Sequence, residues 1–244
     1  MSRFFVGSDA VDGDKIYIRG EDARHIARAL RMAEGDFVTV SDGEGNVYSC
    51  RLIKIRDEEC VCEVRERKNS DSEQPLKIAL YMGYPKGDKL EFVIQKATEL
   101  GASEILPFES SRCIKRPKAD KAEKKDARLA RIAEEAAKQC GRCAVPKVHS
   151  PLDFKSMVEE AAKADLPLFC YEEEGGVSLK SAIEAKKEFD TVSVVIGPEG
   201  GFSPEEAEYA RKCGLISVGL GKRILRCETA PLYVLSVLSY LAEL

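Results

Sequence analysis

The chain has 244 residues, of which 44% are hydrophobic and 33% are charged, and its formal net charge is −4. This composition is typical of a globular protein with one large or two smaller domains, and no apolar run reaches the roughly 18 residues that a membrane-spanning helix needs. The first residues lack the apolar core of a signal peptide, so we expect a cytoplasmic protein whose nine cysteines are reduced thiols.

The N-terminal part, residues 1–70, has the pattern of several short β-strands. Two strand-like runs, FVTVS at 37–41 and NVYSCRLIKI at 46–55, flank a glycine-containing turn that predicts a hairpin. A third run, CVCEVRER at 60–67, continues the alternation. Short strands joined by tight turns favour a small β barrel.

One helix is expected within this part, over residues 20–32. Ile26 and Leu30 are four residues apart and predict a single apolar face. Three arginines at the same helical spacing form a basic stripe: Arg24, Arg28 and Arg31. The polar stretch at 67–75 then reads as a linker to a second domain, residues 76–244.

From residue 76 onward, strands and helices alternate. The first pair is a strand at 76–85 and a helix at 88–101, which Asp88 and Glu91 would cap and Gly101 would end. Further strands are expected at 103–108, 166–171, 191–196 and 215–220. Such alternation predicts an α/β fold with a parallel sheet that helices cover on both faces.

Positive charge is concentrated between Ser110 and Lys147, where twelve Lys and Arg residues stand against five Asp and Glu residues. A local basic surface can attract a polyanion although the whole protein is acidic. A solvated helix face would explain the same charges, so the segment alone does not decide between the two.

A glycine-rich turn follows the apolar run in VSVVIGPEGGFSPEE, residues 192–206. A nucleoside triphosphate loop would end in Lys-Ser or Lys-Thr, where this sequence has Phe202-Ser203, and the dinucleotide pattern G-x-G-x-x-G is absent. Ser203, Pro204 and Glu206 predict a helix that begins with a capping box. The turn therefore either serves only this connection or holds a ligand other than those two nucleotide classes.

A second glycine turn lies in LISVGLGKRILRCETA, residues 215–230. We expect the two turns to follow adjacent strands and to meet at the carboxyl edge of the sheet, where α/β proteins bind ligands. Lys222, Arg223 and Arg226 flank the second turn, and an arginine beside a ligand can fork onto anions or electron-rich oxygens. The residues by themselves indicate a small ligand together with a polyanion.

The segments IGPEGGFSPEE (196–206) and LGKRILRCETA (220–230) together resemble the 16S ribosomal RNA uridine N3-methyltransferases, the small subunit methyltransferase E family of the SpoU–TrmD superfamily. RHIARALRMAEGD (24–36), KGDKLEFVIQKATELGA (86–102) and AEEAAKQCGR (133–142) extend the resemblance along nearly the whole chain. It implies a PUA-like barrel, a C-terminal trefoil knot that binds S-adenosylmethionine, a homodimer, and 16S ribosomal RNA or the small ribosomal subunit as partner.

The resemblance also implies site residues. Those expected to line the cofactor are Tyr171, Glu172, Ile196, Gly197, Glu199, Gly200, Gly201, Leu220, Gly221, Ile224, Leu225, Arg226 and Thr229. Those expected to meet RNA are Arg24, His25, Arg28, Arg31, Lys86, Lys89, Arg112 and Arg142.

Methylation of uracil N3 requires that its proton leave. The protein must lower the free energy of an anionic ring, with a base or with cations near the ring oxygens. Arg226 is the candidate for the cationic role, and Glu228 either accepts the proton or only favours the start of the last helix. A base inside folded RNA would also have to be turned out of its stack.

Two other readings compete. Cys140-Gly-Arg-Cys143 fits a redox or zinc motif, but Cys140 is expected at the end of a helix, where no helix dipole lowers a thiol pKa, and a second cysteine pair is missing from this domain. We therefore predict no metal site. The other reading is an RNA- or ribosome-binding factor that has the fold without the chemistry.

Overall fold

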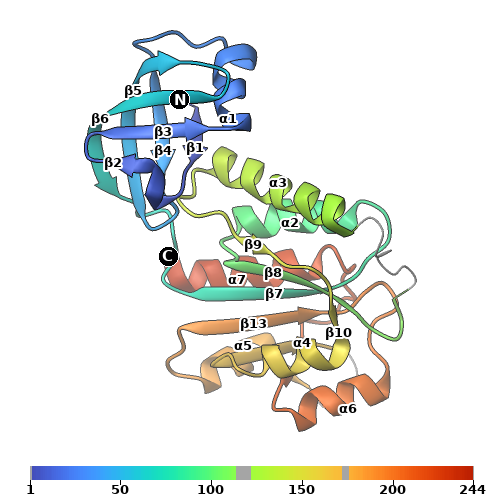
Figure 1. The fold of residues 1–244 in the computed structure, drawn as a ribbon. Helices are drawn as coiled ribbons and strands as arrows, with labels where there is room; N and C mark the ends of the chain where they lie inside the picture. Colours follow the sequence, from blue (N-terminus) through green and yellow to red (C-terminus); the bar gives the residue numbers. More distant parts are fainter. Residues whose placement is uncertain (1, 114–121, 172–175, 244) are drawn as a thin grey trace. The chain divides into compact units, whose positions relative to one another are not determined.

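The computed structural model describes residues 2–113, 122–171 and 176–243. The chain forms two compact units, coloured from blue to red along the sequence in Figure 1. The first unit is Met1–Glu73 with Ala137–Val145, and the second is Gln74–Ala136 with Pro146–Leu244. Among the described residues, no helix is both long and apolar enough to cross a membrane.

The first unit is built on a curled six-stranded sheet (Figure 1). Its strands lie in the order β1 (Arg3–Phe5), β4 (Phe37–Ser41), β5 (Asn46–Ile55), β6 (Glu59–Asn69), β3 (Lys15–Arg19) and β2 (Val11–Asp12). The hairpin predicted around residues 42–45 joins β4 to β5 and is confirmed. Alternate residues of these strands, such as Ile16, Val38 and Leu52, are fully buried in one core inside the curl.

The helical segment of this unit differs from its prediction. Helix α1 (Glu21–Arg24) continues as a π turn, η2 (His25–Ala29), in which the Leu30 amide donates to the His25 carbonyl. Leu30 is the C-cap of this turn, and Arg31 after it has φ +50°, so the helical backbone ends at Leu30. Ile26 is buried, but Leu30 is 39% exposed, and the prediction of one apolar face for both residues is wrong.

The stretch predicted as a linker at 67–75 begins as strand. Strand β6 runs to Asn69, which pairs with Asn46 of β5. The alternation of side chains in the sequence ends before the strand does, because the last residues of β6 are exposed on both faces.

The second unit contains an eight-stranded sheet whose paired strands are all parallel, as predicted. The order is β10 (Leu152–Asp153), β8 (Glu104–Glu109), β7 (Lys77–Gly83), β13 (Thr191–Ile196), β11 (Leu166–Cys170), β14 (Ile216–Gly219) and β12 (Val177–Ser178), with β9 (Lys147–Val148) paired to β8. The central strands are buried on both faces, which explains their nearly continuous apolar runs.

Helices lie on both sides of this sheet (Figure 1). Helices α4 (Phe154–Ala161) and α6 (Pro204–Lys212) pack into one core with the side chains of Tyr81 and Val195. Helices α2 (Lys89–Glu99) and α7 (Ala230–Glu243) pack together, and α7 also contacts β13. The remaining helices are α3 (Ala122–Cys140) and α5 (Leu179–Ala185).

Two helix-end predictions can be compared with the structure. Gly101 has φ +84°, follows Leu100 at the C-cap of α2, and ends the helix as predicted. Asp88 precedes α2 but its side chain makes no capping hydrogen bond, and Glu91 instead pairs with Arg128 at 2.8 Å. The predicted capping box of α2 is therefore wrong.

All nine cysteines are free thiols. Cys140 is the last residue of α3, as predicted, and is exposed, whereas Cys143 is buried. Among the described residues, no group of three or more His, Cys, Asp or Glu side chains is arranged to hold a metal ion.

Candidate functional site

The candidate site lies at the carboxyl edge of the parallel sheet in the second unit. The two glycine turns follow β13 and β14. The prediction that these strands are adjacent is wrong, because β11 lies between them. Tyr171, which follows β11, donates its backbone amide to Val218 of β14 at 3.1 Å. The end of β11 thus stands between the two turns and forms a third wall.

The first turn connects β13 to α6. It closes through a hydrogen bond from the Gly201 amide to the Pro198 carbonyl at 2.9 Å, and Gly201 has φ +65°, where a side chain would be strained. A Cβ on Gly197 would lie 3.1 Å from the ring of Phe202. That ring is buried and its centroid is 4.3 Å from that of Phe169, so it anchors the turn in the core.

The helix start after this turn is formed as predicted. Ser203 and Glu206 make both hydrogen bonds of a capping box, with Pro204 at the first helical position. The Glu206 carboxylate also accepts the Ser111 amide at 2.7 Å, which links the start of α6 to the segment after β8. Arg112, the next residue, donates to the Gly200 carbonyl at 3.2 Å.

The second loop runs from Leu220 to the start of α7. Gly221 has φ +112° and no atom within 4 Å of the position of a Cβ, so main chain is exposed here. The Arg226 carbonyl accepts the amides of Thr229 and Ala230 at 2.8 and 2.9 Å, which closes the first turn of the last helix. Ile224 is 81% exposed.

A cavity of about 710 Å³ lies between these segments. Its lining combines bare main chain, apolar side chains and charged groups. The lining residues are Lys89, Arg112, Cys170, Tyr171, Ile196, Gly197, Pro198, Glu199, Gly200, Gly201, Phe202, Val218, Leu220, Gly221, Lys222, Arg223, Ile224, Leu225, Arg226, Cys227, Glu228 and Ala230.

The structure brings most of the predicted cofactor residues together in this cavity. Those that line it are Tyr171, Ile196, Gly197, Glu199, Gly200, Gly201, Leu220, Gly221, Ile224, Leu225 and Arg226. Thr229 is exposed beside the lining, and Glu172 lies outside the described residues. The two predicted catalytic residues, Arg226 and Glu228, both line the cavity.

A network of charges occupies one side of the cavity. The Lys89 ammonium lies 3.1 Å from Glu199 and 3.1 Å from Glu228, and the Cys227 thiol donates to Glu228 at 3.2 Å. Partial burial acts to raise the pKa of Glu228, but its own amide, the Cys227 thiol and Lys89 outweigh this and lower it. Burial and the neighbouring Glu228 raise the pKa of the Cys227 thiol to about 12, so this thiol is protonated at neutral pH.

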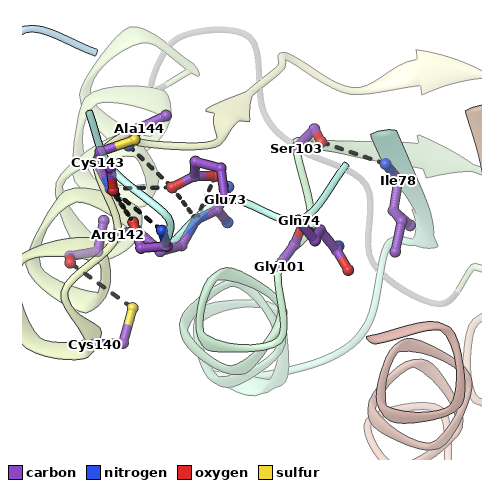
Figure 2. Close-up of polar contacts among 12 residues, drawn as sticks. Glu73, Gln74, Ile78, Gly101, Ser103, Cys140, Arg142, Cys143 and Ala144 are labelled. Atoms are coloured by element: carbon purple, nitrogen blue, oxygen red, sulfur yellow. Dashed lines mark hydrogen bonds and ion pairs between the residues drawn. The ribbon is translucent and has the colours of Figure 1, made fainter. Parts of the chain in front are cut away.

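The residues predicted to meet RNA are divided between the units. In the first unit Arg24, His25 and Arg31 are exposed, and Arg28 is exposed but paired with Asp57. Arg142 also belongs to the first unit, where its side chain is only 7% exposed and ion-paired with Glu73, as Figure 2 shows. In the second unit Lys86 and Arg112 are exposed, whereas Lys89 lies in the charge network of the cavity.

Sequence reasoning missed several lining residues. Cys170 and Val218 stand at the ends of β11 and β14, and Cys227 and Ala230 precede or begin α7. Each lies within two residues of a predicted residue, so its position in the chain was a usable signal. Lys89 was missed as a cavity residue for another reason, since its part in the cavity depends on two carboxylates far away in the sequence.

Comparison with known families defines the class of protein. Residues 72–239 match the RNA methyltransferase domain, and residues 18–65 match the RNA methyltransferase PUA domain. The second match lies within the first unit, and the first match covers the whole candidate site. The class is that of RNA methyltransferases with a PUA domain.

Individual relatives narrow the class. The chain is 38% identical to ribosomal RNA small subunit methyltransferase E of Bacillus subtilis, over 100% of this chain and 98% of the relative. It is also similar to the crystal structure of a ribosomal RNA small subunit methyltransferase E from Neisseria gonorrhoeae bound to S-adenosylmethionine. That match has a TM-score of 0.87 and 30% identity and covers 99% of this chain and 98% of the other. The chain belongs to the ribosomal RNA small subunit methyltransferase E family.

Proposed function

We propose that this protein transfers a methyl group from S-adenosylmethionine to N3 of a specific uridine in 16S ribosomal RNA. The observation that supports this most is the single cavity formed by the 197–201 turn, the end of β11 and the 220–228 loop. Family membership supports the reaction class, and the Neisseria relative that binds S-adenosylmethionine supports the donor.

The cavity suits S-adenosylmethionine. Its volume of about 710 Å³ falls within the range of small-molecule sites, and Gly201 and Gly221 leave main chain open to a bent ligand. Apolar side chains such as Ile196 and Leu225 suit an adenine ring, and the carboxylates of Glu199 and Glu228 suit a cation. The proposed binding set is Tyr171, Glu172, Ile196, Gly197, Glu199, Gly200, Gly201, Leu220, Gly221, Ile224, Leu225, Arg226 and Thr229. When bound, S-adenosylmethionine supplies an electrophilic methyl group on a positively charged sulfur.

The chemistry left to the protein concerns the acceptor. Arg226 is exposed at the cavity, where its guanidinium can stabilise negative charge on a uracil oxygen as N3 loses its proton. Glu228 is ionised at neutral pH, because its pKa is lowered, and it is available to accept that proton. In uracil a ring carbonyl oxygen lies next to the N3–H group. The oxygen would face the Arg226 guanidinium, and the N3–H would face the Glu228 carboxylate.

In this proposal the two domains have different functions, RNA binding and methyl transfer. Residues 1–70 form the PUA-like domain, and their exposed Arg24, His25, Arg28 and Arg31 bind RNA. Residues 76–244 form the methyltransferase domain, where the exposed Lys86 and Arg112 also bind RNA. Arg142 is left out of this set because Glu73 already holds its buried side chain.

Three further features belong to the proposal. The C-terminal domain contains a trefoil knot, the protein acts in the cytoplasm on 16S ribosomal RNA or the small subunit, and it is a homodimer. The dimer is supported by exposed apolar side chains on α7, with Tyr240 at 64% and Leu241 at 54% exposure. Apolar groups that gather on one helix face commonly mark a subunit interface.

The test uses small-subunit RNA from cells that lack the protein. The wild type should bind S-adenosylmethionine by calorimetry, transfer labelled methyl to this RNA, and leave the label at uridine N3 by mass spectrometry. Arg226→Ala keeps the main chain of residue 226 beside the donor, so it should lower the transfer rate about 100-fold and change the donor affinity much less, since the lost guanidinium interaction forms mainly in the transition state. Arg211→Ala, an exposed arginine of α6, is the control. A protein that binds RNA but never S-adenosylmethionine would instead be a binding factor.

A further inference from the structure

Lys89 connects two segments of the cavity that are far apart in the sequence. Its ammonium is 3.1 Å from Glu199, in the turn after β13, and 3.1 Å from Glu228, in the loop before α7. One ammonium can reach both carboxylates only if they lie side by side. Lys89 is the first residue of α2, where a positive charge is unfavourable to the helix dipole, so these contacts rather than the helix explain its position.

Each carboxylate has a second partner that fixes its orientation. The Lys86 amide donates to Glu199 at 3.1 Å, and the Cys227 thiol donates to Glu228 at 3.2 Å. The side chains of Lys89, Glu199 and Glu228 are 35%, 24% and 19% exposed, so the network is partly shielded from water. Interactions of this kind are stronger than those of fully exposed ion pairs.

The titratable and charged groups around Glu228 come from three segments. Lys89 faces it from α2, Cys227 and Arg226 flank it in its own loop, and Glu199 shares the same ammonium from the turn after β13. The pKa of Lys89 is raised by hydrogen bonds to Glu199 and then Glu228, so it is charged throughout the neutral range. Without this charge, two neighbouring carboxylates in a partly buried site would repel each other, and one of them would take up a proton.

We propose that Lys89 is a positioning residue for methyl transfer, which keeps Glu228 ionised and correctly placed to accept the proton of the target base. This rests on the function proposed above. The N3–H bond breaks, its electron pair stays on nitrogen, and the proton passes to the Glu228 carboxylate. The N3 electron pair then forms the nitrogen–methyl bond while the sulfur–methyl bond breaks, and the electron pair of the broken bond stays on sulfur. Lys89 does not touch the reacting atoms and acts through Glu228.

The experiment compares single-turnover methyl transfer from about pH 6 to about pH 9, with donor and RNA saturating, for Lys89→Met, Lys89→Arg and the wild type. Lys89→Met should be about tenfold slower than the wild type near pH 6 and approach it near pH 9, because Glu228 then takes up a proton nearer neutrality. The ratio to the wild type removes the pH dependence of the uridine itself. Lys89→Arg preserves the charge and should restore most of the low-pH rate.

The matched control is Lys96→Met on the same helix. Lys96 is 33% exposed and pairs with Glu99 at 2.8 Å, away from the cavity lining, so its rate should follow the wild type at every pH. In a Glu228→Gln background, Lys89→Met should have little further effect on the rate, since the group it acts on is gone. This double-variant cycle also tests the proposal independently of the pH profile.

Three results would overturn the proposal: an equal loss in Lys89→Met at all pH values, a loss of RNA affinity without a change in the saturated rate, or fully additive effects of Lys89→Met and Glu228→Gln. The first would assign Lys89 a purely structural part, and the second would place it on the RNA surface. If the wild type transfers no methyl group, the proposed function itself fails, and this outcome is distinct from the other three.

Discussion

The guanidinium of Arg142 lies 2.6 Å from the carboxylate of Glu73, with the two side chains 7% and 24% exposed (Figure 2). The same carboxylate accepts the backbone amides of Cys143 and Ala144 at 3.0 and 3.2 Å. Glu73 therefore holds the segment after α3 within the first unit. The Cys140-Gly-Arg-Cys143 stretch suggested redox or zinc chemistry. In the structure its arginine, Arg142, has a packing function through the ion pair with Glu73.

Loss of the Arg142 side chain should destabilise the fold. Arg142→Ala leaves the Glu73 carboxylate partly buried without its cation, and breaking such a pair typically lowers the free energy of unfolding by about 3 kcal/mol. Urea unfolding followed by circular dichroism measures this. Arg131→Ala is the control, because Arg131 forms only an exposed pair with Glu135 on α3 and should cost about 0.5 kcal/mol or less. Equal effects of the two variants would contradict the prediction.

The Glu73 carboxylate should also make stability depend on acid pH. Burial acts to raise its pKa, but the Arg142 ion pair and the amides of Ala144 and Cys143 lower it below the ordinary value of 4.5. Its contribution is thus complete above about pH 4.5 and is lost as the pH falls further through the folded-state value. Glu73→Gln should lower the free energy of unfolding at pH 7, and its difference from the wild type should shrink below about pH 4.5.

A constant difference between Glu73→Gln and the wild type down to acid denaturation would show that the ion pair is not responsible. Glu188→Gln, at an exposed carboxylate of the second unit, is the control and should change the free energy of unfolding by less than about 0.5 kcal/mol.

Gly201 tests the main-chain part of the cavity. Its φ of +65° disfavours a β-branched side chain, so Gly201→Val should distort the turn and weaken S-adenosylmethionine binding at least tenfold by calorimetry, or about 1.4 kcal/mol. Gly214→Val is matched, since Gly214 also has a positive φ of +95° and no neighbour within 4 Å of a Cβ, but lies after α6 outside the lining. It should lower stability while the donor affinity remains. Undiminished affinity in Gly201→Val would remove the turn from the binding site.

The exposed apolar side of α7 should determine the oligomeric state. Two glutamates in place of Tyr240 and Leu241 would have to be buried in the proposed dimer interface, so this double variant should be monomeric by light scattering, whereas the wild type should be dimeric. Ile53→Glu, at a 40% exposed apolar side chain of the first unit, should remain dimeric. A monomeric wild type at micromolar concentration would refute the dimer.

Features that depend on neighbouring residues could be read directly from the chain. Contacts within a few residues determine the capping box of Ser203 and Glu206, the end of α2 at Gly101 and the 42–45 hairpin. The parallel strands were predicted from the regular alternation of strand and helix patterns. The two glycine turns were recognisable for the same reason, because glycine permits backbone conformations that other residues avoid.

Only the tertiary structure decided which distant groups meet. It placed β11 between the strands that carry the glycine turns and left Leu30 exposed at the end of a π turn. It also paired Glu91 with Arg128 instead of the α2 amides and buried Arg142 against Glu73. It also brought Lys89 to Glu199 and Glu228. Charged side chains are long and their partners are set by the packing of whole strands and helices, so local sequence carries no record of these pairs.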